Sequence, residues 1–357
     1  MPVVHVLAFL AGLSLVIFTL RSGIRTFIMP RSVNDSMTRA VFNLVFAIFL
    51  FAAPPTRDYE YRDRVFSFFA PVSLITLPLV WMTVVLLGYM GMFWSLGIDT
   101  LDRAFIASGS SLVTLGFAIP TTTPGAILTF SEAAIGLLLV ALLIAYLPTI
   151  YSSFSRREVA VTMLEVRAGS PPSAVELISR FHALGRLEKL TELWEDWETW
   201  FAEIEETHTS LGMLALFRST QPNHSWVTAS GAVLDGASLM ASTVDAPRDP
   251  QAELCIRAGY LALRYIADFF DIPYVPVVSW DDPISVTREE YDDACSQLET
   301  AGVPLKSDRE KAWRDFVGWR VNYDMVLLEL ARLTIAPYAP WISDRARMPA
   351  PQQRVKA

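Results

Sequence analysis

A short polar stretch in the first third of the chain constrains the fold more than any other feature. It covers residues 108–120 and reads Ser-Gly-Ser-Ser-Leu-Val-Thr-Leu-Gly-Phe-Ala-Ile-Pro. It lies between two apolar segments, residues 66–94 and 126–151, in which Glu132 is the only charged residue. Each segment is long and apolar enough to cross a bilayer, whereas the stretch between them is too polar to do so. Irregular backbone at membrane depth must be buried in protein or line water. The sequence therefore predicts a loop that enters the membrane and returns.

The residues just before this loop predict a short helix. It would cover residues 100–113, and either Asp99 or Thr100 can cap its start. The C-terminal end of the helix would point at residues 114–117, which read Thr-Leu-Gly-Phe. Gly116 permits the backbone dihedral angles that turn successive carbonyl groups toward one axis.

The order of these elements, an apolar segment, a short helix, a Thr-x-Gly-aromatic loop and a second apolar segment, resembles the pore module of the tetrameric potassium-channel superfamily. The resemblance covers residues 66 to about 157. It implies an integral membrane pore module whose filter replaces the water around a cation with backbone carbonyls and a Thr hydroxyl. Because one loop supplies a quarter of such a cage, it also implies a homotetramer. The filter residues that it implies are Thr114, Leu115, Gly116, Phe117 and Ala118.

The loop departs from the Thr-Val-Gly-Tyr-Gly form of a potassium filter in one respect that bears on selectivity. Ala118 stands where the second glycine belongs, and no acidic residue follows it directly. The alternative to a pore is a structural re-entrant loop or a loop packed against lipid.

Two residues of the second apolar segment are candidates for supporting or gating the loop. Glu132 is either a carboxylate stabilised by the dipole of the helix that starts near it, or a group that braces the short helix or sets the field at the outer mouth. The resemblance implies that Gly136 is a gating hinge. The alternative interpretation is that Gly136 allows a close contact between helices.

The N-terminal region predicts how the chain is threaded through the membrane. Residues 3–20 form an apolar anchor, and residues 21–39 hold four Arg and one Asp, which the positive-inside rule places in the cytoplasm. Residues 41–53 are apolar, but the segment gives only about 15 helical residues, about 22 Å, short of the roughly 30 Å hydrocarbon core. We therefore expect three spans with the N-terminus outside. Four spans, at odds with the charge rule, are the alternative.

The charge of the chain divides unevenly along its length. Residues 1–155 contain eight Arg, no Lys and seven acidic residues, so the totals of 29 basic and 37 acidic leave 21 and 30 for the remainder. That remainder has helical periodicity throughout and predicts an acidic, all-α cytoplasmic domain, which argues against a nucleic-acid partner. The predicted organisation is an anchor with an interfacial or second apolar helix, a pore module, a helical cytoplasmic domain and a flexible tail, at residues 1–65, 66–157, 158–343 and 344–357.

The sequence of the C-terminal domain predicts a series of helices and contains no recognised catalytic motif. Proline and polar breaks delimit helices at residues 174–184, 186–208, 210–217, 227–240, 250–270, 288–301 and 307–335. The helical spacing of the tryptophans in the second of these helices predicts core or interface packing rather than an aromatic platform; they are Trp194, Trp197 and Trp200.

Other side chains in this domain carry only weak signals of chemistry. Glu205 and His208 have the spacing of half a carboxylate metal site, but a second such pair is missing. Cys255 and Cys295 would be free core thiols in a reducing cytoplasm. A polar cluster on an otherwise apolar helix predicts a buried hydrogen-bond network; its members are Arg320, Asn322, Tyr323 and Asp324. We therefore expect no enzyme, no metal site and no cofactor other than a permeant ion.

These observations together predict a homotetrameric channel for monovalent cations, potassium by the resemblance, in the lipid bilayer of a bacterial-type inner membrane. The cytoplasmic domain would couple the pore to a ligand or protein that no motif identifies. The alternative is a non-conducting membrane scaffold or sensor with a pore-like fold, which the Ala118 departure favours.

Overall fold

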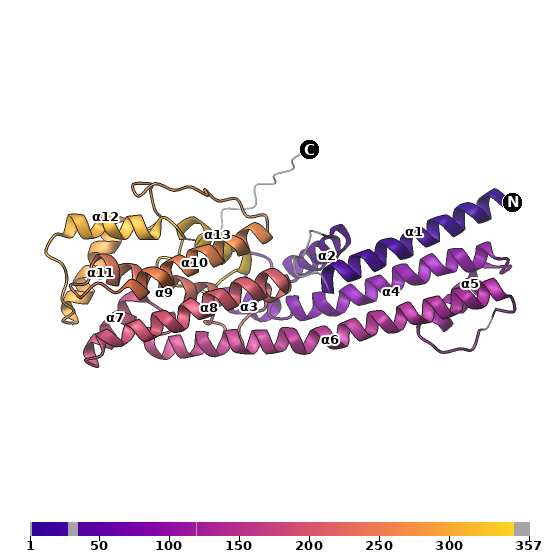
Figure 1. Cartoon of the computed structure of the whole chain (residues 1–357), viewed down its shortest axis with the longest axis horizontal. Helices are drawn as coiled ribbons and strands as arrows, with labels where there is room; N and C mark the ends of the chain where they lie inside the picture. Colours follow the sequence, from indigo (N-terminus) through magenta and orange to yellow (C-terminus); the bar gives the residue numbers. More distant parts are fainter. Residues whose placement is uncertain (1, 28–34, 119, 346–357) are drawn as a thin grey trace. The chain divides into compact units, whose positions relative to one another are not determined.

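The computed structural model of the chain describes residues 2–27, 35–118 and 120–345. The chain divides into two compact units, Met1–Ser152 and Ser153–Ala357. Within the described residues, every regular element is a helix, and the only β feature is an isolated antiparallel bridge between Val244 and Leu305. The predicted all-α fold class is therefore confirmed (Figure 1).

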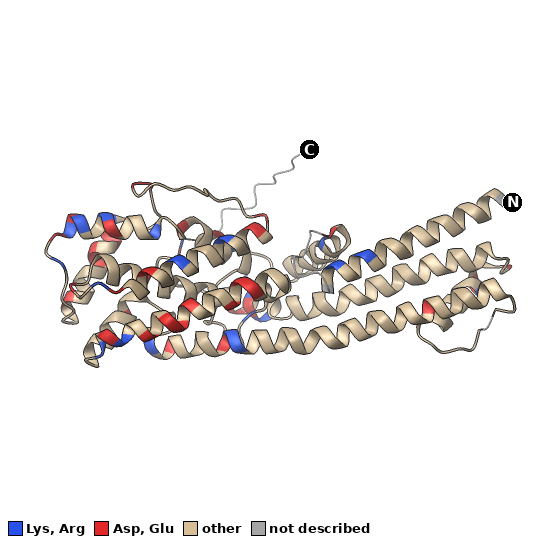
Figure 2. Cartoon of the chain, viewed as in Figure 1, with Lys and Arg blue, Asp and Glu red and all other residues tan. Residues whose placement is uncertain are grey.

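Three helices are long and apolar enough to cross a membrane, as the sequence predicted. They are α1 (Pro2–Phe27), α4 (Phe69–Ser95) and α6 (Thr123–Ala168). Figure 2 shows long tan stretches, without charged residues, on these helices and many charged residues in the C-terminal unit. This distribution is compatible with a membrane protein that carries a polar part. We expected α6 to end near Arg157, but it continues unbroken to Ala168.

Helices α1 and α4 pack closely as an antiparallel pair. The rings of His5 and Trp94 lie 4.7 Å apart at one end, and the indole of Trp81 donates to the Ser22 hydroxyl over 3.1 Å toward the other. In between, a Cβ on Gly12 would lie only 2.3 Å from a carbonyl oxygen of α4. Glycine therefore allows the two backbones to approach, which is how helices commonly associate in lipid.

The shorter apolar helix α2 (Ser36–Ala52) stays at one end of α4. Its N-cap, Asp35, also accepts a hydrogen bond from the Ser22 hydroxyl near the end of α1. Farther along, the Phe46 ring packs against Phe69 at the start of α4, with centroids 5.6 Å apart. Figure 1 shows α2 at the end of the α1–α4 pair away from the N-terminus. This placement agrees with a helix that does not cross the membrane a second time.

A brief helix links α2 to α4. It is α3 (Tyr59–Phe66), which Asp58 caps by accepting a hydrogen bond from the amide of Tyr61. The mixed charges of this segment explain its short length, because they cannot enter the apolar core.

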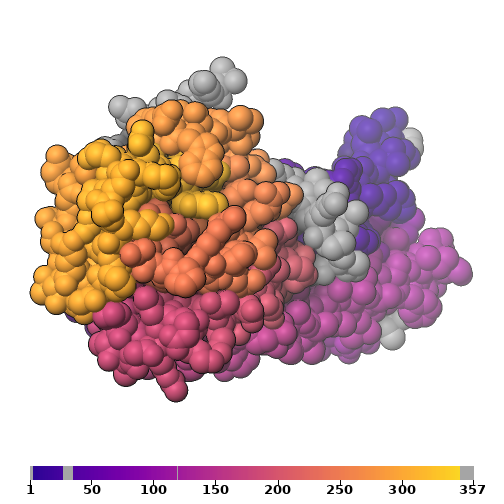
Figure 3. Space-filling view, turned by 60° about the vertical axis from the view of Figure 1, so that its left-hand side comes forward, coloured from indigo at the N-terminus to yellow at the C-terminus, as the bar shows by residue number. Residues whose placement is uncertain are grey.

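The C-terminal unit is a bundle built around one buried helix. It contains the last part of α6 and the helices α7 (Ala174–Ala183), η1 (Leu187–Lys189), α8 (Leu190–Ser210), η2 (Gly212–Leu216), α9 (Trp226–Ser242), α10 (Pro250–Phe269), α11 (Arg288–Thr300), α12 (Arg309–Arg320) and α13 (Asp324–Thr334). Helix α9 is central: α7, α10, α12 and α13 contact it, and of its residues only Met240 and Ala241 are not fully buried. Its small side chains permit this close packing. Figure 3 shows one face of the unit, which α7 and α8 (rose) share with the segments from α10 onward (orange to yellow).

The apolar face predicted for the helix at residues 186–208 is confirmed in α8. Its members are all buried: Leu190, Leu193, Trp197, Trp200, Phe201 and Ile204. Trp194 is buried as well, so the three tryptophans are core residues and not an exposed platform.

Two helix predictions in this unit are wrong in detail. In place of the α-helix expected at residues 210–217, α8 ends at Ser210 and a 3₁₀ helix, η2, follows. The helix expected at residues 307–335 is two helices, α12 and α13, because the Asn322 side chain donates to the carbonyls of Gly318 and Trp319 over 2.9 and 3.1 Å. These bonds add a side-chain donor to carbonyl groups at the end of α12.

The first two residues of the tail predicted at residues 344–357 form ion pairs. The guanidinium of Arg345 pairs with Asp344 at 2.9 Å and also with Glu290. Residues 346–357 lie outside the described residues.

Candidate functional site

The short helix expected before the loop is present as α5 (Leu101–Leu112). Of the two candidate caps, Thr100 takes the position, and its hydroxyl accepts a hydrogen bond from the amide of Arg103 over 3.3 Å. Threonine suits this role because its oxygen replaces a carbonyl that the first turn lacks.

Helix α5 turns back alongside α4 and lies against α6 as well. The Ser108 hydroxyl is 2.9 Å from the carbonyl oxygen of Leu86 in α4 and 2.5 Å from Oε1 of Glu132 in α6. At the end of α5, the carbonyl oxygen of Leu112 faces Gly136. Helix α5 therefore contacts both long helices, and a loop follows it before α6 begins.

One serine of α5 holds the backbone of the following loop. The carbonyl oxygen of Ser110 accepts hydrogen bonds from the amides of Leu115 and Gly116 over 2.8 and 3.3 Å. Its hydroxyl accepts from the amides of Phe117 and Ala118 over 3.0 and 3.1 Å. Four successive amide groups thus point toward α5. The sequence reasoning missed Ser110, although a serine in the last turn of a predicted helix is a known partner for free backbone groups.

The loop backbone alternates between left-handed and right-handed φ values. Thr114 has φ 56° and Gly116 has φ 72°, whereas Leu115 between them has a negative φ. A left-handed φ is rare for a β-branched residue and marks strain of the kind found at functional sites. Such alternation turns successive N–H groups to one side and the carbonyls to the other. Among the residues that the structure describes, the carbonyl oxygens of residues 114–117 accept no hydrogen bond.

The loop is open on the side away from α5. The side chains of Leu115 and Phe117 are 65% and 67% exposed, and a Cβ on Gly116 would meet no atom within 4 Å. The sequence-predicted filter residues are therefore brought together on one exposed edge, with Ala118 at its end.

Glu132 lies inside the unit and faces α5. It is fully buried, and its Oε2 has no hydrogen-bond partner. It sits about two and a half turns after Thr123, where α6 begins, so it is beyond the reach of the helix dipole. Its contact with Ser108 favours the bracing role over the dipole alternative.

Gly136 is a point of close contact between α6 and α5. A Cβ at this position would lie 2.1 Å from the carbonyl oxygen of Leu112, a distance that real side chains do not reach. The contact explains the glycine without a hinge, and α6 runs through it as a continuous helix.

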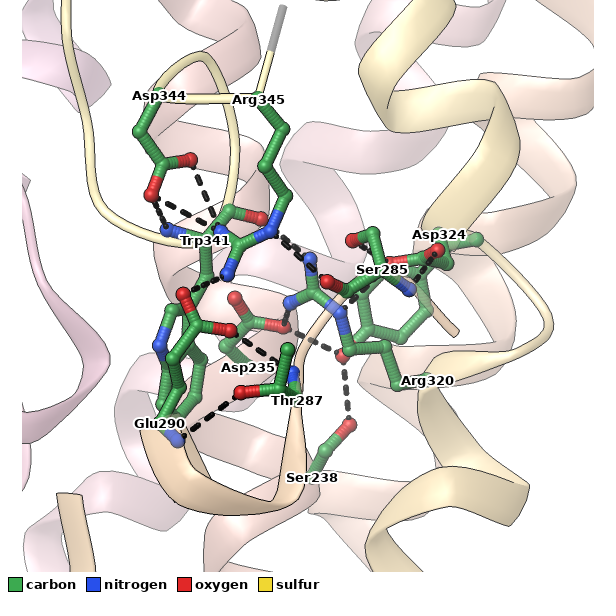
Figure 4. Close-up of polar contacts among 11 residues, drawn as sticks. Asp235, Ser238, Ser285, Thr287, Glu290, Arg320, Asp324, Trp341, Asp344 and Arg345 are labelled. Carbon is green, nitrogen blue, oxygen red and sulfur yellow. Dashed lines mark hydrogen bonds and ion pairs between the residues drawn. The ribbon is translucent and has the colours of Figure 1, made fainter. Parts of the chain in front are cut away.

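The polar cluster predicted in the C-terminal unit is a buried hydrogen-bond network, as expected (Figure 4). The guanidinium of Arg320, fully buried, pairs with Asp235 of α9 and with Asp324, the latter at 2.8 Å. The Tyr323 hydroxyl donates to Asp235 over 2.8 Å, and Asp324 accepts from the Ser285 amide and hydroxyl over 2.7 Å each. The fourth predicted member, Asn322, caps α12 instead.

Burial and charge act in opposite directions on this network. Burial raises the pKa of Asp235, and the charge of Arg320 opposes that rise. Burial lowers the pKa of Arg320, but Asp235 and Asp324 raise it further, so that it lies above its ordinary value. Asp235 was not identified beforehand. Its signal was available, since it is the only charged residue in the helix predicted at residues 227–240.

The remaining candidates are core residues. His208 is buried, with Nε2 3.3 Å from the Arg157 guanidinium and its ring 4.8 Å from that of Trp226, while Glu205 is half-buried. No group of three or more potential metal ligands occurs in the described part of the chain. Cys255 and Cys295 are buried and free, as predicted.

Comparison of the chain with protein-family models, with curated proteins and with solved structures finds no match. The residues and their geometry therefore carry the functional argument alone.

Proposed function

We propose that the chain forms a homotetrameric channel for monovalent cations in which residues 114–118 are the selectivity filter. One observation carries the proposal. Ser110 holds four successive loop amides, which leaves the carbonyls of residues 114–117 without a hydrogen bond within the described residues. Carbonyl oxygens presented together along one edge are the groups that replace water around a dehydrated cation.

The number of copies follows from the chemistry of such a filter. A single loop surrounds only part of an ion, so several loops must meet on one axis. The exposed edge formed by Leu115, Gly116 and Phe117 is the surface that would face that axis. Four copies related by rotation close the cage, as closed cyclic symmetry requires.

Potassium is the ion that we expect to pass, despite Ala118. A second glycine in a filter supplies backbone freedom. Here the amide of Ala118 is already held by the Ser110 hydroxyl over 3.1 Å, so the backbone reaches this point without glycine. We place the channel in a bacterial-type inner membrane, with the C-terminal unit in the cytoplasm as the part that responds to a signal.

The test is potassium flux into liposomes that carry the purified full chain, with Gly116→Val as the variant. Gly116 has φ 72° and open space around it, so valine strains the backbone without a collision. Gly97 is a matched control because it has φ 99°, also lacks neighbours within 4 Å, and lies outside the loop. We expect Gly116→Val to lose flux and Gly97→Val to keep it, at equal helical content.

Three outcomes would change the proposal. Flux that persists in Gly116→Val would remove residues 114–118 from the pathway. Equal sodium and potassium flux would keep the channel and discard its selectivity. A wild-type protein that is folded, monomeric or dimeric, and silent would favour the scaffold or sensor, because fewer than four loops cannot close a carbonyl cage.

A further inference from the structure

The C-terminal unit contains a cavity that the proposed channel does not use. Its volume is about 140 Å³, and it opens where the start of α7, the middle of α9, α11 and the turn after α13 meet. Engineered apolar cavities of about 150 Å³ hold a benzene molecule, so this cavity accepts a compact ligand of that size. The polar and aromatic groups that line it include Ser173, Asp235, Glu290, Gln297 and Trp341.

Two carboxylates line the cavity, and one of them can accept a further hydrogen bond. Asp235 is only 2% exposed, and its Oδ1 accepts from both Arg320 and Tyr323. Its Oδ2 has no hydrogen bond among the described residues, and Figure 4 shows this second oxygen without a dashed contact. Glu290 stands beside it, held by Arg345 and by the amide of Thr287 over 2.8 Å.

The charges around these two carboxylates do not cancel. Two guanidiniums, those of Arg320 and Arg345, face four carboxylates, which leaves two negative charges in excess; the carboxylates are Asp235, Asp324, Glu290 and Asp344. A cation in the cavity would offset part of this excess.

The start of α7 also lines the cavity. Ser173 occupies the N-cap position, but its hydroxyl makes no capping hydrogen bond. The amides of the first turn, at Ala174 and Val175, therefore lack a side-chain partner and border the cavity. Such a helix start favours a carboxylate or phosphate.

An aromatic wall completes the site. Trp341 lines the cavity with its backbone in the left-handed region, at φ 63°. Its carbonyl accepts from Arg320, and its amide donates to Asp344 over 3.2 Å. The same network that supplies the carboxylates thus holds a strained tryptophan in place, and an indole face attracts an ammonium group.

We propose that this cavity binds a small zwitterion of the size of an α-amino acid. The ammonium group lies at Oδ2 of Asp235 and near Glu290 and the Trp341 ring, and the carboxylate lies at the start of α7. L-alanine has as many non-hydrogen atoms as benzene, so it matches the volume. The proposal does not depend on ion conduction.

The test is isothermal titration of the purified full chain in detergent with glycine, L-alanine and L-serine in turn. Ethylammonium and propionate, each with one of the two charged groups, are the comparison ligands. We expect a zwitterion to bind more tightly than either. Glu290→Gln should weaken that binding about tenfold, because a charge-assisted contact is lost. Glu289→Gln is the matched control: it removes the same charge from an exposed neighbour that does not line the cavity.

A second variant separates binding from folding. Ala294→Leu would fill the cavity from α11 with an apolar side chain and should abolish binding while the ligand-free melting temperature stays within a few degrees. Ethylammonium that binds as tightly as L-alanine would overturn the zwitterion assignment. Absence of heat with all three amino acids, or equal affinity in Glu290→Gln and Glu289→Gln, would overturn the site.

Discussion

A single hydroxyl group connects α5 to both long helices beside it. Ser108 faces two acceptors, the Leu86 carbonyl and Glu132, and its removal would leave both oxygens of a buried carboxyl without a partner. We expect Ser108→Ala to lower the free energy of unfolding by about 1–3 kcal/mol. The measurement is denaturant unfolding of the purified protein in detergent.

Ser111 provides the control for this prediction. It lies one turn later on the same helix and is equally buried, but its hydroxyl donates only to the Ala107 carbonyl of that helix. Ser111→Ala should therefore change stability little. Equal losses in the two variants would show that the bridge to Glu132 contributes nothing. Glu132→Gln, which keeps a hydrogen-bonding group, should preserve flux if Glu132 braces α5 and alter it if its charge sets the field at the outer mouth.

His208 should make the stability of the C-terminal unit depend on pH. Burial, with the neighbouring Arg157 charge, holds the pKa of His208 well below its ordinary value of 6.5. The folded state therefore keeps a neutral ring where the unfolded chain binds a proton. Its contribution to stability is complete above pH 6.5 and is lost as the pH falls below that value, by up to about 1.4 kcal/mol per pH unit.

The measurement for this prediction is urea unfolding followed by tryptophan fluorescence between pH 7.5 and 5. His208→Gln removes the titrating group and keeps a polar side chain beside Arg157. We expect a shallower loss of stability at acid pH in this variant. Parallel curves for the variant and the wild type would assign the pH dependence to other groups.

For single residues, the sequence predicted which side chains belong to the candidate sites more readily than it predicted their hydrogen-bond and ion-pair partners. The loop residues and the Arg320 cluster could be selected from residue type and spacing. Residue type gave a signal for Ser110 and Asp235 as well, but it did not identify their partners: Asp235 is 85 residues from Arg320 in the chain. Long-range partners of this kind leave no local periodicity.

Among the elements, the contact between α5 and α6 distinguishes two roles for Gly136. If the glycine serves close packing, Gly136→Ala places a Cβ 2.1 Å from the Leu112 carbonyl and should cost about 1–3 kcal/mol of stability. If it serves only as a gating hinge, stability should stay constant while flux changes. Thermal melts and liposome flux on the same preparation separate these results.

Gly109 is the matched control for the packing argument. It lies on α5, and a Cβ there would come no closer than 4.0 Å to its nearest neighbour. Gly109→Ala should leave stability unchanged or raise it slightly, since alanine favours helix. Destabilisation by both alanines would point to a general intolerance of α5 and α6 to substitution rather than to the contact at Leu112.

The extent of the elements was predictable where local signals exist and not where tertiary contacts decide. The start of α5 followed from Thr100, and the helix expected at residues 288–301 begins at Arg288, where the structure shows a capping box of Thr287 and Glu290. The break between α12 and α13 was missed, because helical periodicity continues on both sides of residues 321–323. There, the Asn322 side chain donates to the carbonyls of Gly318 and Trp319, a contact that the hydrophobic periodicity does not register.

For the molecule as a whole, composition predicted the division of the chain better than any single motif did. The sparse charge of the first 152 residues and the dense charge of the rest correspond to the two units (Figure 2). Composition does not determine how many times the chain crosses the membrane. Three helices have the required length, and α2 does not.

The position of the N-terminus distinguishes three spans from four. With three spans, the start of α1 and the residues just before α6 lie on the same side of the membrane. With four, they lie on opposite sides, because α2 adds one crossing. Both native cysteines are buried, so a single introduced cysteine can report its side through reaction with a membrane-impermeant maleimide. Suitable positions are exposed ones: Val3 for the start of α1, Thr121 for the outer side and Thr56 for the inner side.

We expect Val3→Cys and Thr121→Cys to react in intact cells and Thr56→Cys to react only after the membrane is opened. The four Arg of residues 21–39 favour this arrangement, since basic loops stay in the cytoplasm. The ring contacts of α2 favour it as well, because Phe46 and Phe49 lie against Phe66 at the end of α3 and Phe69 at the start of α4. Reaction of Thr121→Cys in intact cells together with protection of Val3→Cys would establish four spans, and α2 would then have to cross with only about 26 Å of helix.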